Sequence, residues 1–132
     1  MSSPFPSDPV DTSVLVDARC QPLDTAMLVT VAGELDMTTA SQVEVVLMTA
    51  MDEAGAHREV VVDLTGTSYL DSSGLDLLAS CHQRGAREGM TLRIVASSRA
   101  VLRPIQLTGL DGMFLLHPDV AEALAAGRDR RR

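Results

Sequence analysis

Three consecutive valines, Val60 to Val62, constrain the fold of this chain more than any other feature. The stretch VVVDL at residues 60–64 is β-branched and apolar at successive positions, so a strand built from it must be covered on both faces. The next segment, YLDSSGLDLLASC at residues 69–81, leads into a helical pattern that ends at Gly89. We therefore predict a central strand at residues 59–64 and a helix from Ser72 to about residue 88.

Strands and helices alternate along the rest of the chain. We predict strands at residues 13–18, 27–32, 91–96 and 113–116, and helices from soon after Asp36 to Ala54, after Ser98 to about Leu107, and over 118–126. The first two strands are joined by a short turn at residues 20–25, which predicts an antiparallel hairpin. The strand-helix-strand units that follow predict parallel pairing with right-handed crossovers. The expected fold class is α/β, with a mixed sheet of four or five strands and about four helices.

Local signals refine the helices and the ends of the chain. Thr39 and Gln42 are spaced as a capping box at the start of the first helix. Pro104 falls inside the third helix, on which Val101, Leu102, Ile105 and Leu107 form the apolar face, and should kink it. Residues 1–12 are rich in Ser and Pro and are expected to be flexible, residues 13–126 to form one domain, and residues 127–132 to form a frayed basic tail.

Composition excludes several classes of function. The net charge of −7 argues against nucleic acid as a direct partner. Cys20 and Cys81 are far apart and the three histidines are scattered, so we expect no metal site and no cofactor. No apolar run is long enough to cross a membrane and no signal peptide is recognisable at the N-terminus, so we expect no membrane partner and a cytoplasmic location.

The stretch Asp71-Ser-Ser-Gly74 is the strongest candidate site. A phosphate-binding G-x-x-x-x-G-K loop and a G-x-S-x-G nucleophile elbow are both missing from the sequence, which argues against an enzyme. One interpretation is simple helix capping by Asp71. Another is that a serine at this helix start carries a phosphate, because free backbone N–H groups favour an anion there, and that Gly74 leaves room for an approaching molecule. A hydrolase that uses Ser72 or Ser73 is a third interpretation, although it lacks a placed base.

In order, the motifs Gly33-Glu-Leu-Asp36, VVVDL, Asp71-Ser-Ser-Gly-Leu75, Ala96-Ser-Ser98 and Leu107-Thr-Gly-Leu110 resemble the STAS domain of bacterial anti-sigma factor antagonists. The resemblance covers about residues 14–126. It implies that the protein binds an anti-sigma factor that is also a serine kinase, and so releases a sigma factor. It further implies that the kinase phosphorylates Ser72 and that a serine phosphatase reverses this. Asp36, Asp71, Ser73 and Gly74 are then expected on the same partner-binding surface. The alternative within this fold is a small STAS subunit that regulates the ATPase of a membrane lipid transporter.

Overall fold

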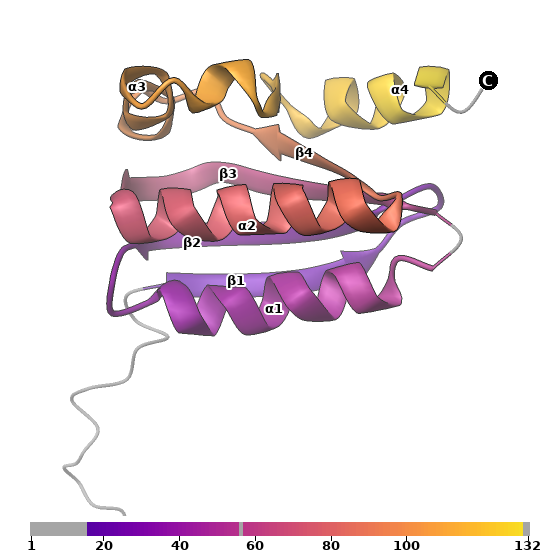
Figure 1. Cartoon of the computed structure of the whole chain (residues 1–132), viewed down its shortest axis with the longest axis horizontal. Coiled ribbons are helices and arrows are strands. Elements are labelled where there is room, and N and C mark those ends of the chain that lie inside the picture. The colour runs from indigo at the N-terminus through magenta and orange to yellow at the C-terminus, as the bar shows by residue number, and fades with distance from the viewer. Residues whose placement is uncertain (1–15, 56, 131–132) are drawn as a thin grey trace, which may run out of the picture.

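The computed structural model describes residues 16–55 and 57–130, which form a mixed α/β fold (Figure 1). Its elements in chain order are β1 (Val16–Pro22), β2 (Met27–Leu35), α1 (Ala40–Glu53), β3 (Glu59–Leu70), α2 (Ser72–Glu88), β4 (Thr91–Val95), α3 (Arg99–Leu107), the 3-10 turn η3 (Leu110–Gly112), β5 (Leu115–His117) and α4 (Val120–Arg130). The five strands form one sheet in the order β1-β2-β3-β4-β5. This confirms the predicted fold class.

The sheet combines one antiparallel pair with parallel strands. β1 and β2 are antiparallel, with Cys20 opposite Val29, as the predicted hairpin requires. The pairs β2–β3, β3–β4 and β4–β5 are parallel, so the carboxyl ends of β2, β3 and β4 lie at the same edge of the sheet. The valine-rich strand β3 is the middle one, as predicted.

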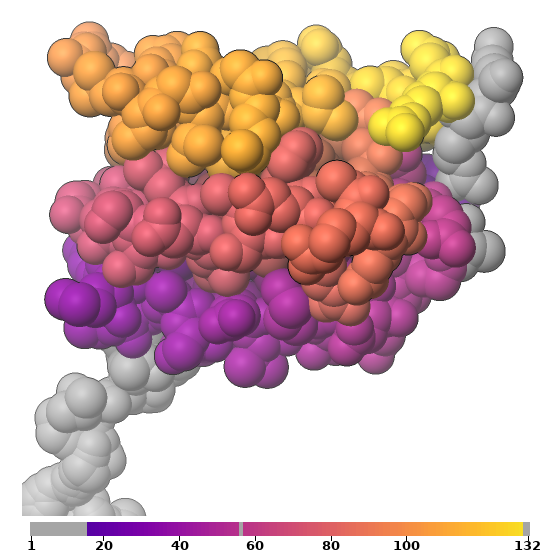
Figure 2. All heavy atoms as spheres, in the orientation of Figure 1, coloured from indigo at the N-terminus to yellow at the C-terminus, as the bar shows by residue number. Residues whose placement is uncertain are grey.

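The three valines of β3 are buried on both faces of the sheet. Val60 and Val62 lie in the main core, to which α1, α2 and α3 also contribute side chains. Val61 points to the opposite face and packs with Ala123 of α4 in a smaller cluster. At most 1% of each valine is exposed, which confirms the prediction of a covered strand. In the space-filling view, α1, α2 and α3 form adjacent bands across one side of the molecule (Figure 2).

The strands β1 and β3 both extend further toward the carboxyl end than predicted. The turn predicted at residues 20–25 is wrong in its first half, because Cys20 and Pro22 belong to β1 and pair with β2. β1 is an edge strand, and an edge strand tolerates a proline. The first residues of the predicted strand, 13–15, lie outside the described residues.

β3 continues beyond Leu64 to Leu70 because its pairing with β2 persists through two shifts of register. The strand predicted at residues 59–64 would place Asp63 near its carboxyl end, whereas Asp63 lies in the middle of the longer strand. Its Oδ1 atom accepts hydrogen bonds from the backbone N and the hydroxyl of Thr65, at 3.0 and 2.8 Å. The hydrogen bonds of the Asp63 carboxylate are thus local, to a residue two positions along the same strand.

The later helices confirm most of the predictions. α2 ends at Gly89, whose φ of 74° is readily adopted by glycine. α3 contains Pro104, and Ser98 occupies its N-cap position without a side-chain hydrogen bond to the helix. Leu107 was expected on the apolar face of α3 but is 72% exposed, because the helix ends there. The kink at Pro104 stays a prediction.

The carboxyl-terminal part differs from the expectation. β5 begins at Leu115 and not at residue 113. α4 continues to Arg130, so the prediction of a frayed tail is wrong for residues 127–130. Gly127 is buried, and a guanidinium nitrogen of Arg130 donates a 2.8 Å hydrogen bond to the Thr91 hydroxyl. Residues 1–12 and 131–132 lie outside the described part of the chain.

Candidate functional site

The candidate site lies at the edge of the sheet where β2 and β3 end. Leu35 and Leu70 are paired at the last position of the two strands, and the backbone N of Asp71 donates to the carbonyl oxygen of Leu35 at 3.2 Å. The loop that carries Asp36 and the start of α2 therefore lie side by side. In Figure 1, the first turns of α1 and α2 are at the same end of the molecule. The structure thus brings the two predicted motifs together.

Asp71 fixes the start of α2. Its backbone is extended, and its Oδ1 atom accepts hydrogen bonds from the backbone N atoms of Ser73 and Gly74, at 2.9 and 3.3 Å. A side-chain oxygen in this position satisfies N–H groups that the helix itself leaves unpaired. The capping interpretation of Asp71 is confirmed, and it sets the direction of the two serines that follow.

The two serines differ in their surroundings. Ser72 is the first residue of α2 and is exposed, whereas Ser73 is half-buried. Ser73 lines a shallow groove of about 220 Å³ between α1 and α2, together with Ala40, Glu44, Asp76, Leu77 and Ser80. The more accessible hydroxyl is therefore that of Ser72.

Gly74 has a packing role that the sequence did not predict. It is buried, and a Cβ atom built on it would lie 2.5 Å from Leu70 Cδ1 and 2.8 Å from Leu35 Cγ. Because Gly74 has no side chain, these two leucines pack directly against its backbone. The glycine thereby lets α2 approach the ends of β2 and β3 closely. This is a packing role, and the expectation that Gly74 leaves room for an approaching molecule stays a prediction.

Asp36 organises the loop between β2 and α1. Its Oδ1 atom accepts hydrogen bonds from the hydroxyl and the backbone N of Thr38, at 2.8 and 2.9 Å, and from the backbone N of Thr39, at 3.2 Å. The bond from the Thr38 hydroxyl is the main cause that lowers the pKa of Asp36 below its ordinary value, so the carboxylate is ionised at neutral pH. A negative charge is therefore held at this edge of the sheet.

The predicted capping box at Thr39 and Gln42 is wrong. Thr39 is at the N-cap position of α1 but makes no side-chain cap hydrogen bond. Its buried hydroxyl donates to the carbonyl oxygen of Glu34 at 2.7 Å and accepts from the backbone N of Asp36 at 3.0 Å. The hydroxyl thus closes the preceding loop, and Asp36 accepts from the backbone N of Thr39, which the Gln42 side chain would bind in a capping box.

Two exposed apolar side chains were missed by the sequence reasoning. Met37 follows Asp36 and is 77% exposed, and Val45 on α1 is 65% exposed. The exposure of Val45 could have been predicted from the sequence. Helical spacing places Val43 and Leu47 on the buried face of α1, and Val45 falls outside that face. Met37 extends the candidate site with an apolar group next to the Asp36 carboxylate.

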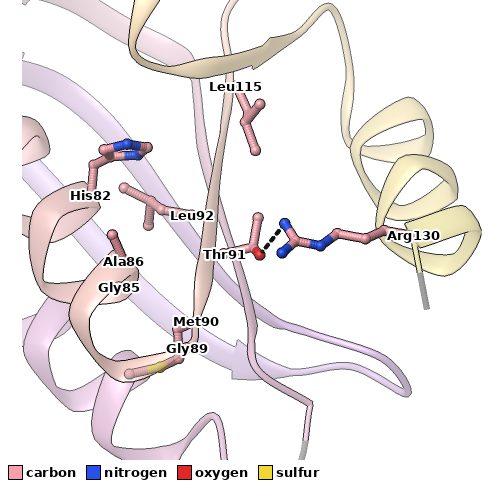
Figure 3. A pocket seen from close by; sticks show the side chains of 9 residues that line it. All are labelled: His82, Gly85, Ala86, Gly89, Met90, Thr91, Leu92, Leu115 and Arg130. Atoms are coloured by element: carbon pink, nitrogen blue, oxygen red, sulfur yellow. Dashed lines mark hydrogen bonds between the residues drawn. The ribbon is translucent and has the colours of Figure 1, made fainter.

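A second groove, of about 250 Å³, lies near the other end of α2 (Figure 3). It is lined by His82, Gly85, Ala86, Gly89, Met90, Thr91, Leu92, Leu115 and Arg130. His82 is half-buried, and its ring meets that of Phe114 edge-on at 6.1 Å between centroids. This groove is separate from the two serines, which lie in the first turn of the helix.

Neither a histidine base beside the two serines nor a metal-binding cluster is found in residues 16–55 and 57–130. No histidine there is hydrogen-bonded to Ser72 or Ser73, so the hydrolase interpretation gains no base. In the same ranges, no three His, Cys, Asp or Glu side chains are grouped so that they could hold a metal ion. None of the helices described has the length and apolar content of a membrane span.

Comparison with known proteins identifies the family. The sequence model of the STAS domain family matches residues 17–123 of this chain. The chain belongs to the STAS domain family. The matched region includes both loops of the candidate site, so this site lies within the part of the chain that is typical of the family.

Relatives and solved structures agree with this assignment. The chain is 31% identical to the anti-sigma-F factor antagonist RsfB of Mycobacterium tuberculosis over 79% of this chain and 83% of the relative. It is 37% identical to an anti-sigma-B factor antagonist of Staphylococcus epidermidis over 65% of this chain and 78% of the relative. A crystal structure of an anti-sigma factor antagonist from Mycobacterium paratuberculosis is 34% identical and superposes with a TM-score of 0.78, covering 86% of this chain and 94% of that one.

Proposed function

We propose that this protein is an anti-sigma factor antagonist whose binding to an anti-sigma factor serine kinase is switched off by phosphorylation of Ser72. The observation that carries the proposal is the exposed hydroxyl of Ser72 in the first turn of α2, next to the loop that holds Asp36. The names of the relatives supply the class of partner, because these proteins are antagonists of anti-sigma factors.

The unmodified surface suits a protein partner. It combines the Ser72 hydroxyl, the Asp36 carboxylate and the exposed Met37 side chain with the groove beside Ser73. Protein interfaces typically join an apolar centre to polar groups at its rim. The residues proposed as partner-binding are therefore Asp36, Asp71, Ser72, Ser73 and Gly74. Gly74 also lets α2 pack against the ends of β2 and β3.

Phosphorylation changes the electrostatics of this surface without requiring a change of fold. A phosphoserine adds about −1.5 to −2 charges at neutral pH. On the free protein, the solvent and the N-terminal end of the helix dipole tolerate this charge. In a complex, the phosphate is desolvated beside the carboxylates of Asp71 and Asp36. A buried charge without a partner is unfavourable by several kcal/mol, so binding weakens.

The remaining parts of the proposal follow from the same switch. The partner kinase uses ATP to modify Ser72, and a serine phosphatase removes the phosphate and restores binding. The protein itself acts as a cytoplasmic binding module and not as an enzyme, and it uses no cofactor, no metal, no direct nucleic-acid contact and no membrane contact.

Site mapping after incubation with the cognate kinase and ATP tests the proposal. We expect a single phosphate on Ser72 by mass spectrometry, none on a Ser72→Ala variant, and unchanged modification of a Ser73→Ala variant. Ser97→Ala, an exposed serine outside the groove beside Ser73, is the matched control. Phosphate on Ser73 instead of Ser72 would contradict the assignment. Recovery of a transporter ATPase, and not of a kinase, in a pull-down from the source cell would favour the alternative STAS subunit.

A further inference from the structure

The second groove forms where β5 is shorter than β4. β5 pairs with residues 93–95 of β4, so Thr91 and Leu92 extend beyond the first residue of β5. At the carboxyl end of α2, the wall of the groove consists of small residues, namely Gly85, Ala86 and Gly89. The short strand and the small side chains together leave the space of about 250 Å³ open to solvent.

One end of the second groove carries a positive charge and hydrogen-bond donors. Arg130 Nη1 donates to the hydroxyl oxygen of Thr91 at 2.8 Å (Figure 3). A guanidinium group has five N–H donors, and a threonine hydroxyl that accepts one bond still has its own proton to donate. Within residues 16–55 and 57–130, no carboxylate forms an ion pair with Arg130. The guanidinium and the hydroxyl can therefore bind a further acceptor side by side.

The remainder of the second groove is largely apolar. Leu92 is buried at its base and Leu115 is exposed at its rim. In Figure 3, both leucine side chains lie between the ring of His82 and the guanidinium group of Arg130. No Asp or Glu is among the described residues that line the groove, although the net charge of the whole chain is −7. The lining therefore suits a molecule with an apolar body and one anionic group.

We propose that the second groove binds a small organic acid. The carboxylate of this ligand lies against the guanidinium of Arg130 and the hydroxyl of Thr91, and its apolar body lies between Leu92, Leu115 and the wall formed by α2. Charge-assisted hydrogen bonds to arginine are stronger than those between neutral groups, and burial of the apolar body removes its surface from water. The groove lies at the other end of α2 from Ser72, so this inference does not depend on the proposed function.

NMR titration of the full-length protein with sodium hexanoate at constant ionic strength tests the inference. We expect saturable shifts of the amide signals of the residues that line the second groove, with a Kd of about 1–10 mM, because so small a ligand makes few contacts. Hexanamide has the same apolar body without the charge, and acetate has the charge without the apolar body. Each of these two compounds should bind at least about threefold more weakly than hexanoate.

Two variants separate the charge from the shape of the groove. Arg130→Gln should weaken the binding of hexanoate by about three- to fivefold and leave that of hexanamide unchanged. Arg128→Gln, on the same helix but outside this groove, should bind hexanoate like the parent. Ala86→Leu places a larger side chain in the groove and should abolish the saturable shifts. Ala100→Leu, at an exposed position of α3, is the matched control and should retain them.

The inference is overturned if hexanoate causes no saturable shifts in the parent, or if hexanamide or acetate binds as tightly as hexanoate. Equal binding of hexanoate by Ala86→Leu and Ala100→Leu would overturn it as well, because the ligand would then lie outside the groove. Should Arg130→Gln fail to fold, the comparison of hexanoate with hexanamide on the parent decides whether the charge of the ligand is recognised.

Discussion

Replacing Gly74 by alanine distinguishes a packing role of this glycine from a role in partner access. The added methyl carbon would lie 2.5 Å from Leu70 Cδ1, 2.8 Å from Leu35 Cγ and 3.1 Å from the Leu35 carbonyl oxygen. Favourable carbon–carbon contacts are about 3.5–4.0 Å. The side chain of Leu70 can turn away, but the Leu35 carbonyl is held by its hydrogen bond with the backbone N of Asp71. Relief of the clash therefore requires α2 to move away from the sheet.

The expected change combines two opposing effects. Overpacking of a buried site typically destabilises a protein by about 1–3 kcal/mol. Alanine in a helix is more favourable than glycine by about 1 kcal/mol. Because two of the distances at Gly74 are far too short, we take the upper part of the overpacking range, which gives a net loss of about 2 kcal/mol. For a chain of 132 residues, this corresponds to a fall in Tm of about 6–10 °C.

Thermal unfolding followed by circular dichroism measures this effect. Gly112→Ala is the matched control, because a Cβ atom at Gly112 would meet nothing within 4 Å, and its Tm should stay within about 2 °C of the parent. If Gly74→Ala unfolds at the parent's temperature or above it, the packing argument fails. An unchanged Tm combined with weaker partner binding would instead support the access role.

Three further outcomes are expected. Glu59→Ala leaves the buried Arg93 side chain without its ion partner and should lower the free energy of unfolding by about 3–5 kcal/mol in urea, and a loss below about 1 kcal/mol would contradict this. Burial raises the pKa of Cys81 to about 11, so the unfolded chain ionises first and stability should fall as the pH rises from 9 toward 11, with a smaller fall in Cys81→Ala. Deleting residues 128–132 removes the last turn of α4 and should lower Tm by a few degrees. Deleting residues 1–10 should leave Tm unchanged. Equal Tm values for the two deletion variants would refute the expected effect of the C-terminal deletion.

The sequence predicted those parts of the fold that depend on local patterns. Three adjacent valines can be satisfied only by a strand covered on both faces, and the structure places α4 on Val61 and the other helices on Val60 and Val62. The start of α2 was likewise predictable, because Asp71 caps the helix by contacts within three residues. Such features need no knowledge of distant segments.

The features that were missed depend on distant or competing contacts. β3 extends to Leu70 because β2 offers a partner beyond a bulge, which no local pattern announces. Thr39 and Gln42 match a capping box, but Asp36 competes for the same backbone N and wins. The packing role of Gly74 becomes visible only when the end of β2 is placed against it. In each of these cases the outcome depends on residues that sequence reasoning had not yet brought into contact.

If a phosphate on Ser72 weakens the binding of the protein to its partner, calorimetry with the cognate anti-sigma factor kinase will detect the loss of affinity. We expect the phosphorylated protein to bind at least about a hundredfold more weakly than the unmodified one, which corresponds to about 2.7 kcal/mol. Ser72→Asp should also bind more weakly. Asparagine has nearly the same size as aspartate but no charge, so the affinity of Ser72→Asn should remain close to that of the parent. Equal affinities for the phosphorylated and unmodified proteins would contradict the account.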